Sequence, residues 1–324
     1  GRRRTEGRNQ LVLDMSRQDV RDYLFQVLSD VFRSAPVAYV KWDMNRNMTE
    51  AASAKLPPER QGETAHRYML GLYELLERLV TAFPDILFEC CSGGGGRFDP
   101  GMLHYMPQTW TSDDTDAVER LKIQYGTSIV YPASAMGAHV SAVPNHQVGR
   151  ITSLEMRGFM AMGGNFGYEL DLSKFSDKER AEVRRQVTLY KDMRGLVQHG
   201  DMYRLKSPFE GNETAWMFVS TDKREAAVFH FRVLGVPNEP LSRLALRGLD
   251  PDLDYRVVRV TTAEGSAGEE TGGDEFSFGG QRADLPAVKP VGVYAGDLLM
   301  RAGLPADGFR GDFSGVLYRL RAVE

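Results

Sequence analysis

Two short segments of the sequence place carboxylates beside other polar groups directly after apolar runs. The first is Lys-Trp-Asp-Met-Asn-Arg at residues 41–46, which follows the apolar run 37–40. The second is Trp-Thr-Ser-Asp-Asp-Thr-Asp at residues 110–116. Two carboxylates that face each other across a sugar ring are the working groups of glycoside hydrolysis, since one attacks the anomeric carbon and the other protonates the leaving oxygen. Asp43 and Asp113 are therefore candidates for such a pair.

Each of these carboxylates also has a plainer interpretation. Asp43 could be an ordinary polar residue where a strand meets solvent. One of Asp113, Asp114 and Asp116 is expected to cap the helix that follows, a contact worth about 1 kcal/mol. Neighbouring aspartates could also hold a divalent cation, but the spacing of a Ca²⁺ loop with its distal glutamate is absent, so no metal is expected.

A third polar segment is the glycine run at residues 92–96, which follows the apolar run 86–91. It lacks the Gly-Lys-Ser/Thr ending of a phosphate-binding loop and the spaced glycines of a dinucleotide fingerprint. No cofactor is therefore expected. The run is better explained as a strand end kept bare so that a ligand can approach the backbone closely.

The elements around these segments alternate between strand and helix up to residue 200. Apolar spacing of three and four predicts helices at 19–33, 64–83, 115–125 and 177–199. Short apolar runs predict strands at 11–15, 37–42, 86–91, 108–111, 127–131 and 159–163. This alternation favours right-handed βαβ units and a parallel sheet, with functional side chains at the carboxyl ends of the strands.

The pattern changes after Gly200 to short strands with a period of two, separated by Gly, Pro and Asp turns. Strands are expected at 216–220, 225–233, 255–261 and 315–320. The predicted fold class is α/β: a (β/α)8 TIM barrel, incomplete at its N-terminus, followed by a C-terminal antiparallel β-sandwich domain. The expected domains are residues 1–200 and 201–324.

Composition restricts the partners and the setting of the protein. The net charge is −4, which gives no reason to expect nucleic acid or a membrane surface as a partner. The two cysteines, Cys90 and Cys91, are neighbours in the sequence and cannot easily form a disulfide with each other. A reducing, cytoplasmic setting is therefore expected.

Several motifs together resemble glycoside hydrolase family 36, the microbial α-galactosidases, over essentially the whole chain. They lie at residues 7–14, 41–46, 91–99, 110–116, 137–141, 144–146 and 298–304. The resemblance implies an N-terminal β-sandwich, a (β/α)8 barrel that this chain would enter at about its third strand, and a C-terminal β domain. The family also takes an acidic pair and a tryptophan from earlier in the barrel, which this sequence does not contain. Homo-oligomers are common in the family.

The resemblance also implies roles for individual residues. Asp43 would be the nucleophile of a retaining exo-α-galactosidase and Asp113 its general acid/base, with Asp114 as the substitute if the register is off by one. The other residues implied to contact substrate are Arg8, Lys41, Cys91, Gly93, Gly94, Trp110 and Asp114. The substrate would be an oligosaccharide of the melibiose or raffinose type. A galactosyl transferase of raffinose-family sugars and a non-catalytic sugar-binding or assembly fragment are the alternatives.

Two geometric expectations follow from this assignment. Lys41 lies two residues before Asp43 on the same strand, so both side chains should project to the same face, where Lys41 could keep Asp43 ionised. The carboxyl groups of Asp43 and Asp113 should lie roughly 5–5.5 Å apart for a retaining reaction.

Overall fold

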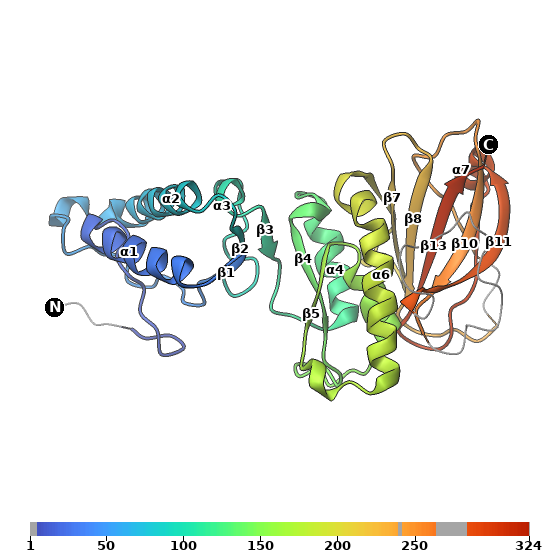
Figure 1. Cartoon of the computed structure of the whole chain (residues 1–324), viewed down its shortest axis with the longest axis horizontal. Helices are drawn as coiled ribbons and strands as arrows, with labels where there is room; N and C mark the ends of the chain where they lie inside the picture. Colours follow the sequence, from blue (N-terminus) through green and yellow to red (C-terminus); the bar gives the residue numbers. More distant parts are fainter. Residues whose placement is uncertain (1–4, 239–241, 264–283, 324) are drawn as a thin grey trace. The chain divides into compact units, whose positions relative to one another are not determined.

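The chain folds into two compact units, Gly1–Asp113 and Asp114–Glu324, in a computed structural model that describes residues 5–238, 242–263 and 284–323 (Figure 1). The first unit contains a short parallel sheet with helices on one face. The second contains two further parallel strands, their helices and a larger antiparallel sheet.

The first unit alternates helices and parallel strands. Its elements are α1 (Gln18–Ser34), β1 (Tyr39–Asp43), the 3-10 helix η1 (Pro58–Glu63), α2 (Thr64–Ala82), β2 (Leu87–Cys91), α3 (Pro100–Tyr105) and β3 (Gln108–Trp110). β1 pairs in parallel with β2, which places Asp43 opposite Cys91. β2 pairs in parallel with β3, which places Cys90 opposite Thr109. The carboxyl ends of the three strands therefore meet at one edge.

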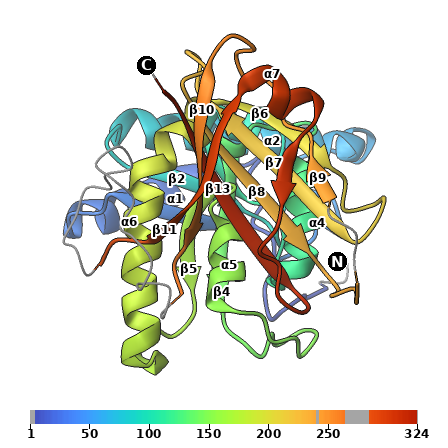
Figure 2. The ribbon, with the colours of Figure 1, turned by 90° about the vertical axis from the view of Figure 1, so that its right-hand side faces the viewer.

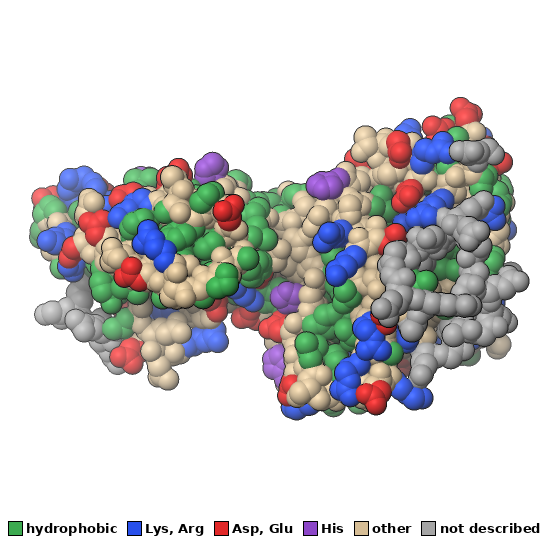
Figure 3. Space-filling model, in the orientation of Figure 1, with side chains coloured by type: hydrophobic (Ala, Val, Ile, Leu, Met, Phe, Trp, Pro, Cys, Tyr) green, Lys and Arg blue, Asp and Glu red, His purple; other side chains and the backbone are tan. Residues whose placement is uncertain are grey.

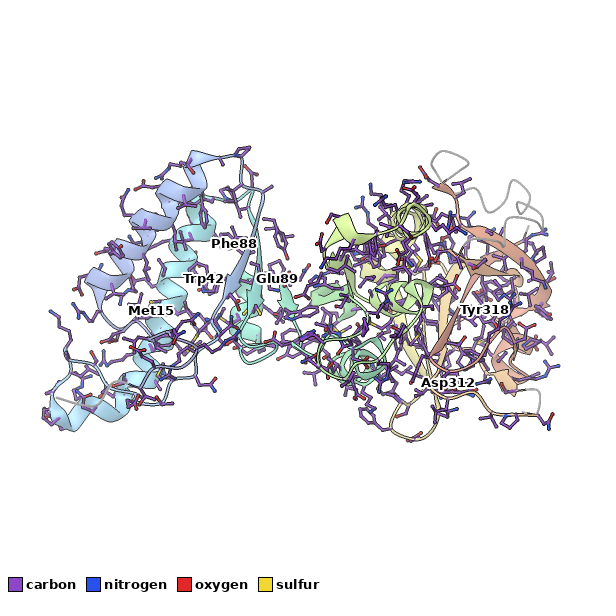
Figure 4. The ribbon with its side chains drawn as sticks, turned by 90° about the horizontal axis from the view of Figure 1, so that it is seen from below. Met15, Trp42, Phe88, Glu89, Asp312 and Tyr318 are labelled. Carbon is purple, nitrogen blue, oxygen red and sulfur yellow. The ribbon has the colours of Figure 1, made fainter. Side chains whose placement is uncertain are left out.

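One face of this sheet forms the core of the unit. Because side chains alternate along a strand, Val40 and Trp42 of β1 face the same side as Phe88 and Cys90 of β2. Apolar residues of α1 and α2 cover that side. Figure 4 shows Trp42 and Phe88 on the helix side of the strands and Glu89 on the other side. The other face carries the polar residues of the strands and is left for the site.

The second unit begins with the elements that follow the first three strands. These are α4 (Ala117–Thr127), η2 (Ala133–Ala135), β4 (Met136–Ser141), α5 (Leu154–Ala161), β5 (Asn165–Glu169), η3 (Leu172–Lys174) and α6 (Asp177–His199). β4 and β5 pair in parallel. α6 begins with a capping box, in which Ser176 and Glu179 satisfy each other's backbone N–H groups.

An antiparallel sheet makes up most of the remaining chain (Figure 2). Its strand order is β11-β10-β13-β8-β7-β6, and a separate pair is formed by β12 and β9. The bounds are β6 (Asp201–Lys206), β7 (Glu213–Val219), β8 (Glu225–Arg232), β9 (Ser242–Leu244), β10 (Asp254–Thr261), β11 (Ala287–Ala295), α7 (Gly296–Arg301), β12 (Leu304–Ala306) and β13 (Ser314–Ala322). Trp216, Phe229 and Phe231 of this sheet share one core with Phe159 of α5 and Leu189 of α6.

The predicted fold class is confirmed: strand–helix units of an incomplete parallel barrel precede an antiparallel domain. Three predicted strands are wrong. Residues 11–15 form no strand, and Leu11 and Leu13 are about half exposed. Residues 127–131 form the end of α4 and a turn, and residues 159–163 belong to α5 and the turn after it. The true strands, β4 and β5, lie further along the chain. The domain boundary at residue 200 stays a prediction.

Apolar side chains reach the surface of the first unit (Figure 3). On α1, Tyr23, Val27 and Val31 are exposed at a spacing of four residues. β1 is also partly exposed, because Tyr39, Lys41 and Asp43 alternate as exposed residues along it. Within the part of the chain that the structure describes, no helix combines the length and the apolar character needed to cross a bilayer.

Two carboxylates meet where α5 and α6 contact the end of β10. Glu155 of α5 accepts hydrogen bonds from the Thr261 hydroxyl and the Thr262 N–H, both at 2.6 Å. The Thr262 hydroxyl lies 3.3 Å from Oε1 of Glu182 on α6. Burial, and after it the charge of Glu155, raises the pKa of Glu182 to about 7. The junction therefore holds a carboxyl group that titrates near neutral pH.

We expect Glu182→Gln to stabilise the protein above pH 7. Because the raised pKa means that the folded state holds the proton more tightly than the unfolded state, the free energy of unfolding falls as the pH rises from about 4.5 to about 7. The variant should be about 1–2 kcal/mol more stable than the wild type at about pH 8, after allowance for partial solvent screening, and nearly equal to it at about pH 4, below the pKa of the unfolded state. Urea unfolding at both pH values measures this. Glu210→Gln, at an exposed position, is the control, and an equal response of both variants would contradict the expectation.

Candidate active site

The candidate site lies at the carboxyl ends of β1, β2 and β3. Asp43 ends β1, Cys91 ends β2 and Trp110 ends β3. The register places Asp43 opposite Cys91, and Cys91 follows directly after Cys90, which pairs with Thr109. Because successive side chains of a strand point to opposite faces, these three side chains lie on the face that the helices leave uncovered. Three of the predicted site residues are therefore neighbours across one small sheet.

Asp43 is held between two neighbours. The Asn45 amide donates to Asp43 Oδ2 at 2.6 Å, and Asn45 Oδ1 accepts the N–H of Gly93 at 3.0 Å. Burial raises the pKa of the Cys91 thiol to about 11, and the hydrogen bond to Asp43 and the charge of Asp43 add to this increase. A hydrogen bond with the Gly94 backbone lowers the pKa but does not outweigh the other effects. The thiol is therefore neutral at physiological pH and lies against the Asp43 carboxylate. Asn45 lies within a motif that the sequence singled out, but the sequence did not indicate its contact with Asp43.

The glycine turn, residues 92–96, brings the loop after β3 close to the end of β2. Gly94 has a φ of +81°, which favours glycine. A Cβ atom on Gly94 would lie 2.6 Å from Cα of Ser112 and 2.8 Å from the backbone nitrogen of Asp113. The absence of a side chain therefore allows the backbone that carries Asp113 to pack against the turn. The close approach of a ligand to this strand end stays a prediction, because the atoms that approach Gly94 belong to the chain itself.

Lys41 pairs with a different carboxylate from the one predicted. Its Nζ is 3.7 Å from Oε1 of Glu89 and 5.2 Å from the centre of the Trp110 ring. Glu89 is buried and also accepts hydrogen bonds from the Tyr39 hydroxyl and, at 2.7 Å, from Gln108 Nε2. Lys41 does share the face of Asp43, as expected, but its ion pair binds it to Glu89. The Lys41 side chain therefore extends across the uncovered face of the sheet from β1 toward β3.

Two predicted residues are placed less directly. Arg8 is exposed and has a φ of +54°. It lies in a tight turn in which the Gln10 N–H donates to the Gly7 carbonyl at 3.0 Å. Asp114 opens the second unit, and its Oδ1 accepts the N–H of Asp116 at 3.0 Å. Asp116, and not Asp113 or Asp114, caps α4, which resolves the capping alternative.

A cavity of about 400 Å³ borders β1. Apolar residues of segment 10–15, α1 and α2 make up much of its lining, which also includes Lys41, Asp43, Arg46 and Arg97. A sugar site needs several polar groups that converge on an otherwise apolar pocket, and these charged side chains provide them. The cavity therefore reaches the candidate site at Lys41 and Asp43. Among the described residues, no group of three or more His, Cys, Asp or Glu side chains could hold a metal ion.

Comparison with known families and proteins places this arrangement among glycosidases. The Melibiase family profile matches residues 1–200, and the profile of the glycosyl hydrolase family 36 C-terminal domain matches residues 213–320. α-Galactosidase AgaA of Geobacillus stearothermophilus is 59% identical over 323 residues, which are 100% of this chain and 40% of that protein. α-Galactosidase Mel36A of Lactobacillus acidophilus is 45% identical over 323 residues, with the same coverage. The chain thus spans 40% of the length of these relatives.

Solved structures agree with the sequence matches. The crystal structure of AgaA aligns with a TM-score of 0.88 at 59% identity, covering 99% of this chain and 40% of that one. Variants of AgaA have been solved in complex with raffinose and with stachyose, each with a TM-score of 0.88 and the same coverage. The galactosidase from Lactobacillus brevis aligns with a TM-score of 0.85 at 45% identity, covering 99% of this chain and 40% of that one.

We expect Asp43→Asn to make the Cys91 thiol more reactive. Removing the neighbouring negative charge should lower the pKa of Cys91 by roughly one unit, and the thiolate is the reacting species. In a Cys90→Ser background, iodoacetamide should then modify Cys91 several-fold faster at about pH 9. Asp30→Asn, on the exposed face of α1, is the matched control. An unchanged rate in Asp43→Asn would show that the carboxylate does not lie beside the thiol.

We expect Gly94→Ala to destabilise the protein more than Gly93→Ala. Both glycines have a positive φ, so each substitution should cost about 1 kcal/mol of conformational strain. A Cβ at Gly93 meets nothing within 4 Å, whereas at Gly94 it meets backbone atoms that cannot rotate away. Gly94→Ala should therefore cost about 1–3 kcal/mol more. Urea unfolding followed by tryptophan fluorescence compares the two, and equal losses would contradict the close backbone approach.

Proposed function

Since the chain belongs to glycoside hydrolase family 36, we propose that the full-length gene product is a retaining exo-α-galactosidase. It removes terminal α-linked galactose from oligosaccharides of the melibiose and raffinose type. The observation that carries the proposal is the convergence of Asp43, the Cys91 thiol and the Asp113 backbone at the end of β2. The relatives named as α-galactosidases, and the AgaA complexes with raffinose and stachyose, support this substrate class.

Asp43 is proposed as the nucleophile and Asp113 as the general acid/base. The Asn45 amide and the Cys91 thiol both contact Asp43 and limit its orientations. Asp113 is preferred over Asp114, because the carboxylate of Asp114 is hydrogen-bonded into the turn before α4. β1 and β3 flank β2, so their axes are about 10 Å apart. Asp113 follows β3 by three residues, and its backbone packs against Gly94 at the end of β2, on the side toward β1. A separation of roughly 5–5.5 Å between the two carboxyl groups is proposed for the retaining pair.

The reaction proceeds in two displacements. An Asp43 oxygen bonds to the anomeric carbon as the glycosidic bond breaks, and Asp113 gives its proton to the departing oxygen. Asp113 then takes a proton from water, whose oxygen attacks the same carbon, and the bond to Asp43 breaks. Because each step inverts the anomeric centre, galactose leaves in its original α configuration.

The other residues are proposed to bind the sugar. Lys41 and Arg8 donate to galactose hydroxyls, and Trp110 forms a wall of the site. Lys41 already lies over the Trp110 ring, which supports their placement on one face. Cys91, as a neutral thiol, and the backbone at Gly93 and Gly94 line the site near the 2-hydroxyl. Asp114 is retained as a second-choice contact.

Two alternatives differ from hydrolysis in ways that can be measured. A galactosyl transferase of raffinose-family sugars would share the covalent intermediate but pass galactose to a sugar acceptor, so products formed at high acceptor concentration separate the two. The 324-residue chain could also be a non-catalytic sugar-binding or assembly fragment. Comparing its activity with that of the full-length gene product tests this alternative.

The setting of the protein is also proposed. A cytoplasmic location is supported by two adjacent free cysteines. Homo-oligomer formation is supported by the family resemblance alone. Domains at 1–200 and 201–324 are supported by the ranges of the two family profiles and by the start of the antiparallel sheet at Asp201.

Proton NMR of the reaction with an aryl α-galactoside tests the proposal directly. The full-length gene product should release α-galactose before mutarotation produces the β anomer. Early β-galactose would contradict the retaining mechanism, and the absence of galactose would contradict the specificity. Asp43→Ala should lower turnover by at least about a thousandfold, because it removes the nucleophile. Asp30→Ala should leave turnover unchanged.

A further inference from the structure

The turn that carries Arg8 has an unfavourable backbone conformation. The Gly7 N–H donates to the Gln10 carbonyl at 3.3 Å, and the Gln10 N–H donates to the Gly7 carbonyl at 3.0 Å. The two central residues, Arg8 and Asn9, have φ values of +54° and +57°. Such a turn favours glycine, asparagine or aspartate at its central positions, because a Cβ atom disfavours positive φ. Arg8 therefore needs contacts from outside the turn to keep this conformation.

Arg46 supplies contacts of this kind from the segment after β1. It lies three residues beyond Asp43 and is only 8% exposed, although it is charged. Its Nη2 donates to the Thr5 carbonyl and, at 3.0 Å, to the Thr49 hydroxyl. Thr5 lies just before the turn at residues 7–10. One guanidinium group thus connects the start of this turn to the segment that follows the proposed nucleophile.

The side chain of Arg46 also packs against the turn itself. A Cβ atom on Gly7 would lie 2.7 Å from Cδ and 2.9 Å from Nε of Arg46. Any side chain at position 7 would therefore displace either Arg46 or the turn. Arg46 and Gln10, the last residue of the turn, also line the cavity that Lys41 and Asp43 border. The turn and the proposed nucleophile thus belong to one part of the first unit.

Glu50 completes this set of contacts. The Thr5 hydroxyl donates to its Oε1, and the Thr49 hydroxyl donates to its Oε2 at 2.6 Å. These hydrogen bonds, and after them the charge of Arg46, lower the pKa of Glu50. The ionised carboxylate therefore holds the same two threonines that Arg46 contacts. Arg46 is fixed at its charged end by partners that are themselves fixed.

We propose that Arg46 is a positioning residue that holds the turn at residues 7–10 so that Arg8 presents its guanidinium group to the sugar. This inference rests on the proposed function, in which Arg8 donates to galactose hydroxyls. Arg46 acts through the turn and Arg8, and not on the sugar directly. A lysine at position 46 would keep the charge but lose the planar fork of donors, so it would not hold the turn in the same way.

A double-mutant cycle separates positioning from general stabilisation. In the full-length gene product, Arg8→Met should lower kcat/KM for melibiose by about 10–100-fold, because a hydrogen bond from a charged group is lost. Arg46→Lys should lower kcat/KM by about tenfold while Arg8 is present, and by less than about twofold in the Arg8→Met background. Such non-additive losses are expected of residues that act as a unit.

Gly7→Ala tests the same contact without changing a charge, and it also serves if Arg46→Lys does not fold. The added Cβ should displace Arg46 and the turn, so kcat/KM should fall by about 3–10-fold while Arg8 is present and hardly at all in the Arg8→Met background. Gly62→Ala is its matched control, since a Cβ at Gly62 meets none of the described atoms within 4 Å.

Arg21→Lys is the matched control for Arg46→Lys. Arg21 belongs to the same unit, is also 8% exposed and also donates to a backbone carbonyl, that of Met15, at 2.8 Å. It contacts the chain beyond the turn, so its substitution should lower stability while kcat/KM for melibiose stays within about twofold of the wild type.

The outcomes separate this inference from the proposed function. Losses in Arg46→Lys and Gly7→Ala that disappear in the Arg8→Met background support the inference. Equal losses in both backgrounds, or no loss, overturn it, while galactose release by the wild type leaves the proposed function intact. Full activity of Arg8→Met would remove the sugar contact of Arg8 and the inference with it. A wild type that releases no galactose overturns the proposed function itself, and with it the inference.

Discussion

The close approach of two backbone segments at the end of β2 is the constraint on which the site depends. The Ser112–Asp113 backbone lies where a side chain on Gly94 would have to be. On the same turn the Gly93 N–H contacts Asn45, which holds Asp43. One short glycine segment therefore sets the positions of residues from both neighbouring strands. A functional pair built on strands at either side of β2 needs such a shared reference, because neither strand contacts the other.

The two faces of the β1–β2–β3 sheet have different roles: one packs in the hydrophobic core, and the other carries the candidate site residues. Residues such as Phe88, with 2% of its surface exposed, pack under α1 and α2, and burying a side chain of this size contributes about 1.5–3 kcal/mol. The opposite face carries Glu89, which is buried although it is acidic. Its hydrogen bonds from Tyr39 and Gln108 and its ion pair with Lys41 offset the cost of burial. This network fixes Lys41 beneath the position proposed for the sugar.

The longer helices were predictable from the sequence because their apolar spacing is regular, as in α6, which matches its predicted range, whereas the short helices α3, α5 and α7 were not predicted. Short apolar runs were less informative. Residues 159–163 read equally well as a buried strand or helix, and the structure places them at the end of α5. β4 and β5 contain a single β-branched residue, Val140, and each includes a glycine, so neither forms the continuous β-branched run that would mark a buried strand. The strand-end argument located Asp43, Cys91 and Trp110. It could not locate Asn45's partner, because hydrogen bonds between loops leave no periodic pattern.

Asp113 differs from the other proposed site residues because it lies beyond the end of its strand. The position of a strand-end residue such as Asp43 is set largely by its own strand and the neighbouring strand. The position of Asp113 depends instead on what holds the loop that follows β3. Gly94 provides such a constraint, because the backbone of Ser112 and Asp113 occupies the space beside it. Gly94 and Asp113 follow different strands, so no local sequence pattern could have connected them. The placement of the proposed general acid, which must move a proton over a short distance, thus depends on a contact outside its own strand.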